Sequence, residues 1–122
     1  MKKVMIVEDN KDLQEIYKMS FEKAGYEVIQ EMDGLDGIAG VVDKSPDVVL
    51  LDIMMPQMDG FEFLKAMREN TSIKIPVIVC SNLSDTETFN RAVKEGAMAV
   101  LLKANYTGKE LVEKVEELMK GR

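Results

Sequence analysis

Two short apolar runs that lack any polar interruption stand out along the chain. Residues 48–51 read Val-Val-Leu-Leu and end at Asp52, and residues 77–80 read Val-Ile-Val-Cys and end at Ser81. Runs of this length and composition are typical of strands buried on both faces, as in parallel α/β sheets. Three further short apolar segments predict strands over residues 3–7, 26–30 and 98–102.

Between and after these strands, apolar residues recur at helical spacing. This pattern predicts helices over residues 11–24, from Asp33, over residues 61–69, from Ser84 to about residue 95, and from Thr107 onward. Asp33 is a suitable N-cap, and Ser84 with Glu87 and Thr107 with Glu110 have capping-box spacing. The inward-facing residues that we expect are Leu13, Ile16, Tyr17, Ser20, Phe21 and Ala24 in the first helix, Leu35, Ile38, Ala39 and Val42 in the second, Phe61, Leu64 and Met67 in the third, and Leu111, Val115 and Leu118 in the last.

Five alternating strand–helix units predict an α/β fold with a parallel sheet, helices on both faces and right-handed crossovers. We expect a flavodoxin-like, doubly wound sheet of five strands in the order 2-1-3-4-5 with five helices. The 122 residues are enough for one domain with a real core, so residues 1–122 are predicted to form a single domain.

Composition removes several classes of function. The chain has no histidine, which excludes histidine catalysis and histidine metal ligands, and its one cysteine, Cys80, excludes an intrachain disulfide. The net charge of −6 argues against a nucleic-acid surface on this domain. No apolar run approaches the length of a signal peptide core or a membrane span, so we expect no membrane partner and a cytoplasmic location.

Charged and hydroxyl residues follow the predicted strands, and the carboxyl ends of parallel strands meet at one edge of a sheet. The residues concerned are Glu8, Asp9, Asp52, Ser81 and Lys103. Taken singly, the acidic pair could cap the first helix, Ser81 could be a loop hydroxyl and Lys103 a solvated charge. Their joint occurrence favours a common site.

Clustered carboxylates raise one another's pKa unless a cation lies among them, and a hard divalent ion such as Mg²⁺ takes oxygen ligands. With the metal bound, Asp52 could remain ionised and act as a nucleophile that forms an aspartyl phosphate. Phosphoryl transfer requires mainly charge neutralisation and in-line positioning. Lys103 and Ser81 could contact oxygens of the transferred group.

These motifs resemble those of response regulator receiver domains of two-component signalling, over essentially the whole chain. The residues that carry the resemblance are Val7-Glu8-Asp9-Asn10, the segment Asp52 to Gly60 (DIMMPQMDG), Ser81 and Lys103. The second motif is the most specific of them. The resemblance is to the chemotaxis type, a receiver that stands as a single domain.

The resemblance implies that Asp52 accepts a phosphoryl group from a phosphohistidine of a sensor histidine kinase or a phosphotransfer protein. It implies that Mg²⁺, or Mn²⁺, is held directly by Asp9, Asp52 and the backbone carbonyl of Met54, and through water by Glu8. Ser81 would be the switch hydroxyl and Lys103 the phosphate contact. Apart from phosphorylating and slowly dephosphorylating itself, such a domain is no enzyme, and it acts on a downstream protein through a surface that the phosphoryl group switches.

The chain departs from the family pattern at several positions. Val100 stands where receivers often have an aromatic switch residue, and Ala104 stands where proline usually follows the lysine. A cis bond before a residue other than proline is costly, so we expect a trans Lys103–Ala104 bond. Met54 and Leu83, two residues beyond Asp52 and Ser81, cannot orient an attacking water, and we therefore expect slow hydrolysis of the phosphorylated form.

Two other functions stay open at this point. The departures at Val100 and Ala104 leave room for a degenerate receiver that works as an interaction module without phosphorylation. A small hydrolase with an aspartyl phosphate intermediate is less favoured, because such enzymes usually carry a second acid two residues after the nucleophile, where this chain has Met54. They also need a cap over the substrate, and the chain has no insertion that could form one.

Overall fold

A computed structural model of the chain describes residues 2–55, 57–70, 72–83 and 85–121. Its parallel sheet has five strands in the order β2-β1-β3-β4-β5, which confirms the predicted flavodoxin-like order. The strands are β1 (Lys3–Val7), β2 (Glu27–Glu31), β3 (Val48–Leu51), β4 (Val77–Ser81) and β5 (Ala99–Leu102). The helices are α1 (Lys11–Lys23), α2 (Gly34–Lys44), α3 (Gly60–Glu69), α4 (Thr86–Lys94) and α5 (Gly108–Lys120), and a short 3-10 turn spans Lys103–Asn105.

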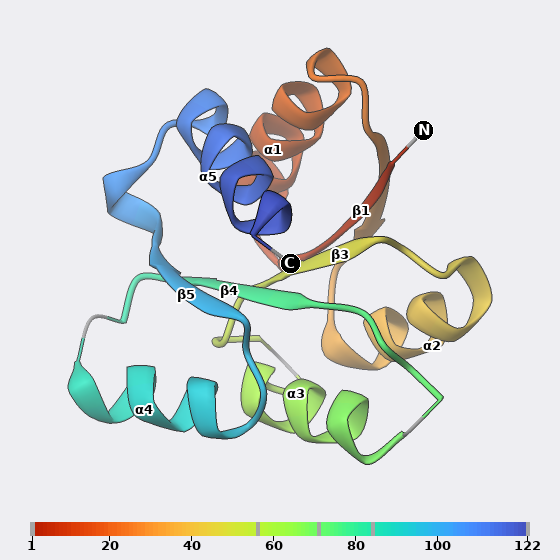
Figure 1. Cartoon of the computed structure of the whole chain (residues 1–122), viewed down its shortest axis with the longest axis vertical. Coiled ribbons are helices and arrows are strands. Elements are labelled where there is room, and N and C mark those ends of the chain that lie inside the picture. Colours follow the sequence, from red (N-terminus) through yellow and green to blue (C-terminus); the bar gives the residue numbers. More distant parts are fainter. Residues whose placement is uncertain (1, 56, 71, 84, 122) are drawn as a thin grey trace.

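Helices cover both faces of the sheet. Helices α1 and α5 lie on one face and α2, α3 and α4 on the other (Figure 1). Alternate residues of the central strands therefore point into two different cores. Val4 and Ile6 belong to the core under α1 and α5, whereas Met5 and Val7 belong to the core above α2, α3 and α4. This two-sided burial explains why the central strands have no polar residue in their interior.

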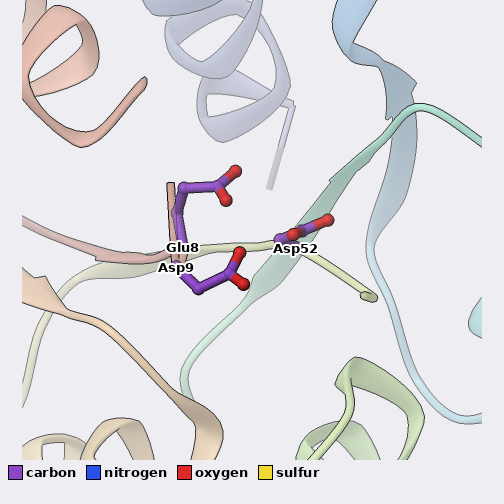
Figure 2. A group of neighbouring side chains, drawn as sticks. All are labelled: Glu8, Asp9 and Asp52. Carbon is purple, nitrogen blue, oxygen red and sulfur yellow. The ribbon is translucent and has the colours of Figure 1, made fainter. Parts of the chain in front are cut away.

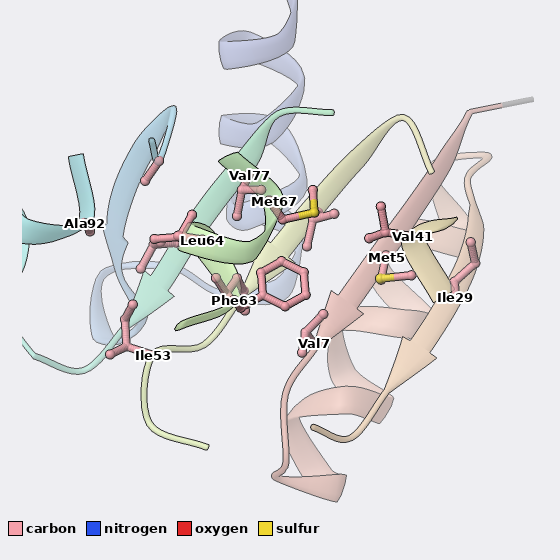
Figure 3. Packing of buried hydrophobic residues seen from close by; sticks show 14 residues of the cluster. Met5, Val7, Ile29, Val41, Ile53, Phe63, Leu64, Met67, Val77 and Ala92 are labelled. Carbon is pink, nitrogen blue, oxygen red and sulfur yellow. The ribbon is translucent and has the colours of Figure 1, made fainter. Parts of the chain in front are cut away.

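The core on the α2, α3 and α4 face is centred on α3. Phe63, Leu64 and Met67 point from α3 toward the strands, and Phe63 lies nearest to Val7 of β1 (Figure 3). Phe63 is fully buried, while Phe61 is only partly buried. All three predicted inner residues, Phe61, Leu64 and Met67, pack against this core, with Phe61 only partly buried. The fully buried Phe63 was not predicted. Helix α3 begins at Gly60, which packs closely against Ile53, and Phe61 lies at the margin of the core.

The orientation of α2 also differs from the prediction. Leu35 is 51% exposed and Val42 63% exposed, and the buried face of α2 carries Gly34, Gly37, Gly40 and Val41 instead. A Cβ atom on Gly37 would lie 2.9 Å from Cε2 of Phe63, so the helix backbone itself packs against the core. Of the four residues expected inside, Ile38 alone packs against the core. The periodicity of large apolar residues could not reveal a buried face on which three of the four buried residues are glycines.

On α1, Tyr17 and Phe21 are buried as expected, but Ile16 is exposed and the polar Gln14 is buried. On α5, Leu111 and Val115 are buried and Leu118 packs against the same core, as predicted.

Side-chain caps fix where the helices begin. Asp33 caps α2 by accepting a hydrogen bond from the Asp36 backbone N–H, and Thr107 and Glu110 form the predicted capping box of α5. Helix α4 is capped by Asp85, whose side chain accepts a hydrogen bond from the Thr88 backbone N–H at 2.9 Å. The predicted cap Ser84 lies outside the described residues.

Candidate functional site

The end of β1 and the end of β3 lie side by side in the sheet. Val7 is level with Leu51, so the next residues, Glu8 and Asp52, are neighbours on adjacent strands. The Asp52 backbone N–H donates to the Val7 carbonyl at 3.0 Å and continues the pairing beyond the strand. The register of two buried strands thus places these carboxylates at the same edge.

Three carboxylates converge there. Glu8, Asp9 and Asp52 each offer one oxygen, and these oxygens lie within 4.8 Å of one another (Figure 2). Glu8 is 3% exposed and Asp52 is 6% exposed, whereas Asp9 faces solvent. The cluster therefore has two buried acids at its base and one acid at its rim.

Lys103 reaches this cluster from the end of the edge strand β5, which β4 separates from β3. Its Nζ lies 2.5 Å from Oε1 of Glu8 and 3.3 Å from Oδ1 of Asp52. Lys103 opens the 3-10 turn after β5, and none of the described peptide bonds is cis, in agreement with the expected trans bond to Ala104. The lysine thus bridges the two buried acids.

Burial and charge raise the pKa of both buried acids. For Asp52 the main cause is burial, and the charge of Asp9 adds to it, while Lys103 and the Met54 backbone N–H oppose it. For Glu8 the main cause is again burial, opposed by the hydrogen bond from Lys103. Burial alone would lower the pKa of Lys103, but the hydrogen bond to Glu8 and the charge of Asp52 outweigh it and raise that pKa. The lysine therefore stays charged and only partly compensates two acids.

The oxygens of the two buried acids are engaged differently. Glu8 uses both oxygens, since Oε1 accepts from Lys103 and Oε2 accepts from the Asn10 backbone N–H at 3.1 Å. Asp52 is contacted through Oδ1. Among the described residues, this oxygen forms an ion pair with Lys103 and accepts a hydrogen bond from the Met54 backbone N–H at 3.4 Å. Oδ2 of Asp52 is the oxygen that these contacts leave available to a ligand.

Ser81 ends β4 and is fully buried. Its Oγ accepts a hydrogen bond from the Leu83 backbone N–H at 3.0 Å, so the hydroxyl proton can still be donated. Ser81 is level with Leu102 of β5, which directly precedes Lys103. The sequence-predicted hydroxyl and ammonium therefore lie at the same edge as the carboxylates.

Apolar side chains border this polar edge. Met54 is 65% exposed, Leu83 is also exposed, and together with Ile53, Met55, Asp59, Phe61 and Arg91 they line a groove of about 430 Å³. The Arg91 guanidinium lies 4.0 Å from the centre of the Phe61 ring, a cation–π contact that sequence spacing could not indicate. Val100 is partly buried and packs against the core on the α2, α3 and α4 face.

The donor set fits a hard divalent cation. Mg²⁺ prefers carboxylate and carbonyl oxygens and keeps several waters, which suits a half-open cluster with Asp9 at its solvent rim. Two buried acids and one lysine leave negative charge that such an ion would neutralise. This charge imbalance is the structural observation that supports a metal here.

Sequence reasoning missed one polar residue beside this edge. Gln14 is buried on α1, and its side chain contacts the backbone at the ends of β1 and β2. The available signal was its position between Leu13 and Tyr17, on the inner face of an amphipathic helix, where a polar side chain must find partners.

Comparisons with a family model and with curated proteins point to the same family. The family model described as "Response regulator receiver domain" matches residues 4–116. Among curated proteins, Protein PilG of Pseudomonas aeruginosa is 35% identical over 81 residues, covering 66% of this chain and 60% of that protein. The DNA-binding dual master transcriptional regulator RpaA of a Synechocystis strain is 29% identical over 98% of this chain and 50% of that protein. The chain thus spans about half to three-fifths of the length of these relatives.

Solved structures give the same result. The receiver domain of the Francisella response regulator 1452 superimposes with a TM-score of 0.89 at 32% identity, with 98% of each chain covered. The chemotaxis protein CheY4 of Vibrio cholerae superimposes with a TM-score of 0.89 at 28% identity, covering 97% of this chain and 98% of that one. Within the described part of the chain, none of the helices has the length and apolar character needed to cross a membrane.

Proposed function

Since the chain belongs to the response regulator receiver domain family, we propose that it accepts a phosphoryl group on Asp52 from a phosphohistidine. The donor would be a sensor histidine kinase or a phosphotransfer protein. The observation that carries the proposal is the position of Asp52 at the end of a buried central strand, beside two further acids and in contact with Lys103.

In the proposed reaction an Asp52 carboxylate oxygen attacks phosphorus and forms an acyl phosphate. The bond between phosphorus and the imidazole nitrogen of the donor breaks, and the electron pair of that bond stays on the nitrogen. Lys103 and the Met54 backbone N–H both contact Oδ1 of Asp52, so the carboxylate is held in one orientation for the attack. Orientation of the nucleophile and charge neutralisation are the main demands of this reaction.

We assign Mg²⁺, or Mn²⁺ in its place, to the acidic cluster. Asp9, Asp52 and the Met54 carbonyl would hold the ion directly, and Glu8 would act through water because Lys103 and Asn10 already occupy its oxygens. When bound, the ion would neutralise negative charge on the transferred group and its acceptor.

Lys103 and Ser81 would bind the phosphoryl oxygens after transfer. The Lys103 ammonium lies 3.3 Å from Oδ1 of Asp52 and would exchange part of its contact with Glu8 for a contact with the new phosphate. Ser81 would donate its hydroxyl proton, which the hydrogen bond from Leu83 leaves available. This exchange of partners would be the local event that changes the protein surface.

The output is proposed to pass through contacts with a downstream protein. By family resemblance the switched surface is formed by α4, β5 and α5, and the kinase docks near α1. Although RpaA is described as DNA-binding, the net charge of −6 argues that this domain does not itself contact nucleic acid. We place the domain in the cytoplasm, with Asp52 phosphorylation as its only chemistry and no separate substrate.

The proposal is tested by the mass of the intact protein after incubation with Mg²⁺ and acetyl phosphate. We expect one added phosphoryl group on the wild type, and none in the Asp52→Asn variant or without Mg²⁺. No adduct on the wild type, together with no response to beryllofluoride, would overturn the proposal. That negative result would favour the alternative, an interaction module that works without phosphorylation. The observation that supports this alternative is Val100, which stands where receivers often have an aromatic switch residue.

The lifetime of the phosphorylated form gives a second test. Met54 is exposed beside the site and cannot hydrogen-bond an attacking water, so self-dephosphorylation is expected to be slow. The Met54→Asn variant, which supplies an amide at that position, should lose its phosphoryl group faster in a time course of intact mass. A wild-type lifetime no longer than that of Met54→Asn would refute this role for the methionine.

A further inference from the structure

Gln14 is a buried polar residue that the proposed reaction does not use. It is 2% exposed, and it lies on the face of α1 that packs against the sheet. Its side-chain Nε2 lies 2.9 Å from the Ile6 carbonyl, 3.0 Å from the Glu8 carbonyl and 2.9 Å from the Glu31 carbonyl. One amide group thus contacts the carboxyl-terminal ends of two adjacent strands.

The orientation of this amide is supported by a second glutamine. Nε2 of Gln30 on β2 lies 3.3 Å from Oε1 of Gln14 and 3.4 Å from its backbone carbonyl. The Gln14 side-chain oxygen thus accepts a hydrogen bond, while its nitrogen faces only carbonyl acceptors. If the amide oxygen and nitrogen exchanged places, the oxygen would face three carbonyls and could accept no hydrogen bond from them. A buried amide with partners on both atoms is held in one position.

The contact with Glu8 bears on the acidic cluster. The Glu8 backbone N–H still pairs with Glu31 at 3.1 Å, but beyond Glu8 the chain leaves β2 and turns into α1. The Glu8 carbonyl and the Asp9 backbone nitrogen belong to one planar peptide unit. A hydrogen bond to this carbonyl therefore fixes where the Asp9 side chain leaves the backbone.

We propose that Gln14 is a positioning residue for the acidic cluster: by holding the Glu8 carbonyl, it directs the Glu8 and Asp9 side chains toward Asp52 and so sets the affinity for Mg²⁺. The inference rests on the proposed function for the identity of the metal. It goes beyond that function in assigning a role to a side chain that touches neither the metal nor the phosphoryl group.

Gln14→Met is the informative variant, because methionine has a similar length but no hydrogen-bond donor for the Ile6, Glu8 and Glu31 carbonyls. Phe21→Leu is the control, since Phe21 is fully buried near the other end of α1 and its truncation should lower stability without touching the end of β1. Gln14→Asn keeps the amide on a shorter stem and tests whether reach matters as well as chemistry.

Two measurements on the full chain, made where circular dichroism shows each variant to be folded, decide the matter. Titration calorimetry with Mg²⁺ should show about 10- to 100-fold weaker binding in Gln14→Met, the range found when groups that orient metal ligands are lost. Hydrogen exchange without metal should show faster exchange at the Asp9 and Asn10 amides. Gln14→Asn should fall between wild type and Gln14→Met, and Phe21→Leu should match wild type in both measurements.

The outcomes separate this inference from the proposed function. If the wild type binds Mg²⁺ and is phosphorylated while Gln14→Met binds Mg²⁺ equally well, the positioning role is refuted and the function stands. Equal weakening in Phe21→Leu would also refute it, because the effect would then follow general stability. If the wild type itself binds no Mg²⁺, the proposed function fails and the inference about metal affinity fails with it.

Discussion

The two faces of the sheet are covered in different ways. Under α1 and α5 the core is filled by large side chains, with Phe21 fully buried and its ring centre 5.2 Å from that of Tyr26 in an edge-to-face contact. On the opposite face, α2 meets the sheet through glycines, and its own Leu35 and Val42 face solvent. Where large residues fill the core, sequence periodicity identified Tyr17 and Phe21 correctly, although it also placed the exposed Ile16 inside. Where the α2 backbone packs against the core, periodicity assigned mostly exposed residues to the inner face.

The candidate site lies between these two layers and depends on both. Gln14 approaches the end of β1 from the α1 side. From the other side, a Cβ on Gly34 of α2 would lie 2.7 Å from the Met58 carbonyl, in the loop that follows Asp52. Helix α1 therefore supports the end of β1, where Glu8 and Asp9 lie. Helix α2 packs closely against the loop after Asp52, which would supply the Met54 carbonyl to a metal.

The largest expected effect comes from emptying the core under α1. Phe21→Ala should lower the free energy of unfolding by about 3–5 kcal/mol, because it removes a large buried ring and leaves a cavity. Urea denaturation measures this loss, and Met19→Ala, which truncates an exposed side chain on the same helix, is the control. A loss for Phe21→Ala no larger than that for Met19→Ala would mean that this layer is not packed as described.

Overfilling the close contact of α2 should give the next largest effect. Gly37→Val should cost about 1–3 kcal/mol, since the new side chain meets Phe63 and Val7, and packed cores resist added volume. Ala39→Val introduces the same side chain on the exposed face of the helix and should change stability little. Equal effects of the two variants in urea denaturation would contradict the glycine-packed face.

Between the layers, the site itself is expected to make stability depend on pH. Because the folded state raises the pKa of Asp52, the folded state binds more protons than the unfolded state above the ordinary value of 3.8. Stability is then lost as the pH rises through this window. Without metal, Asp52→Asn should therefore be more stable than wild type near neutral pH, and the difference should shrink toward acidic pH.

Thermal denaturation from acidic to neutral pH, with and without Mg²⁺, measures this difference. The metal should stabilise the wild type more than the variant, because it binds the ionised cluster of the folded state. A wild type that exceeds Asp52→Asn in stability near neutral pH without metal would show that Lys103 fully compensates the buried acids.

The smallest effect is expected at the outer face of α2. Leu35→Gln and Val42→Thr should each change the free energy of unfolding by no more than about 0.5 kcal/mol, as is usual for exposed positions. Their phosphorylation by acetyl phosphate should also be unchanged. A large loss in either denaturation curve would place these residues inside the core, where the apolar periodicity of the sequence had assigned them.

Several features of this protein could be predicted from the sequence because they depend on local patterns. The buried strands are recognisable from apolar runs, and β1 and β3 begin and end where the pattern indicates. Since parallel strands end at one edge, the convergence of Glu8, Asp9 and Asp52 also followed from the sequence once the strand order was assumed. The capping box of Thr107 and Glu110 is local in the same sense.

Other features were decided only by tertiary structure, because they depend on how closely elements approach and which atoms then meet. The inner face of α2 is set by the space that glycines leave for Phe63, a residue of another helix. The contact of Lys103 with Glu8 joins residues 95 positions apart. The position of Gln14 on the inner face of α1 is visible in the sequence, but its partners are not, because they are carbonyls of two strands that only the folded chain brings within reach of its amide.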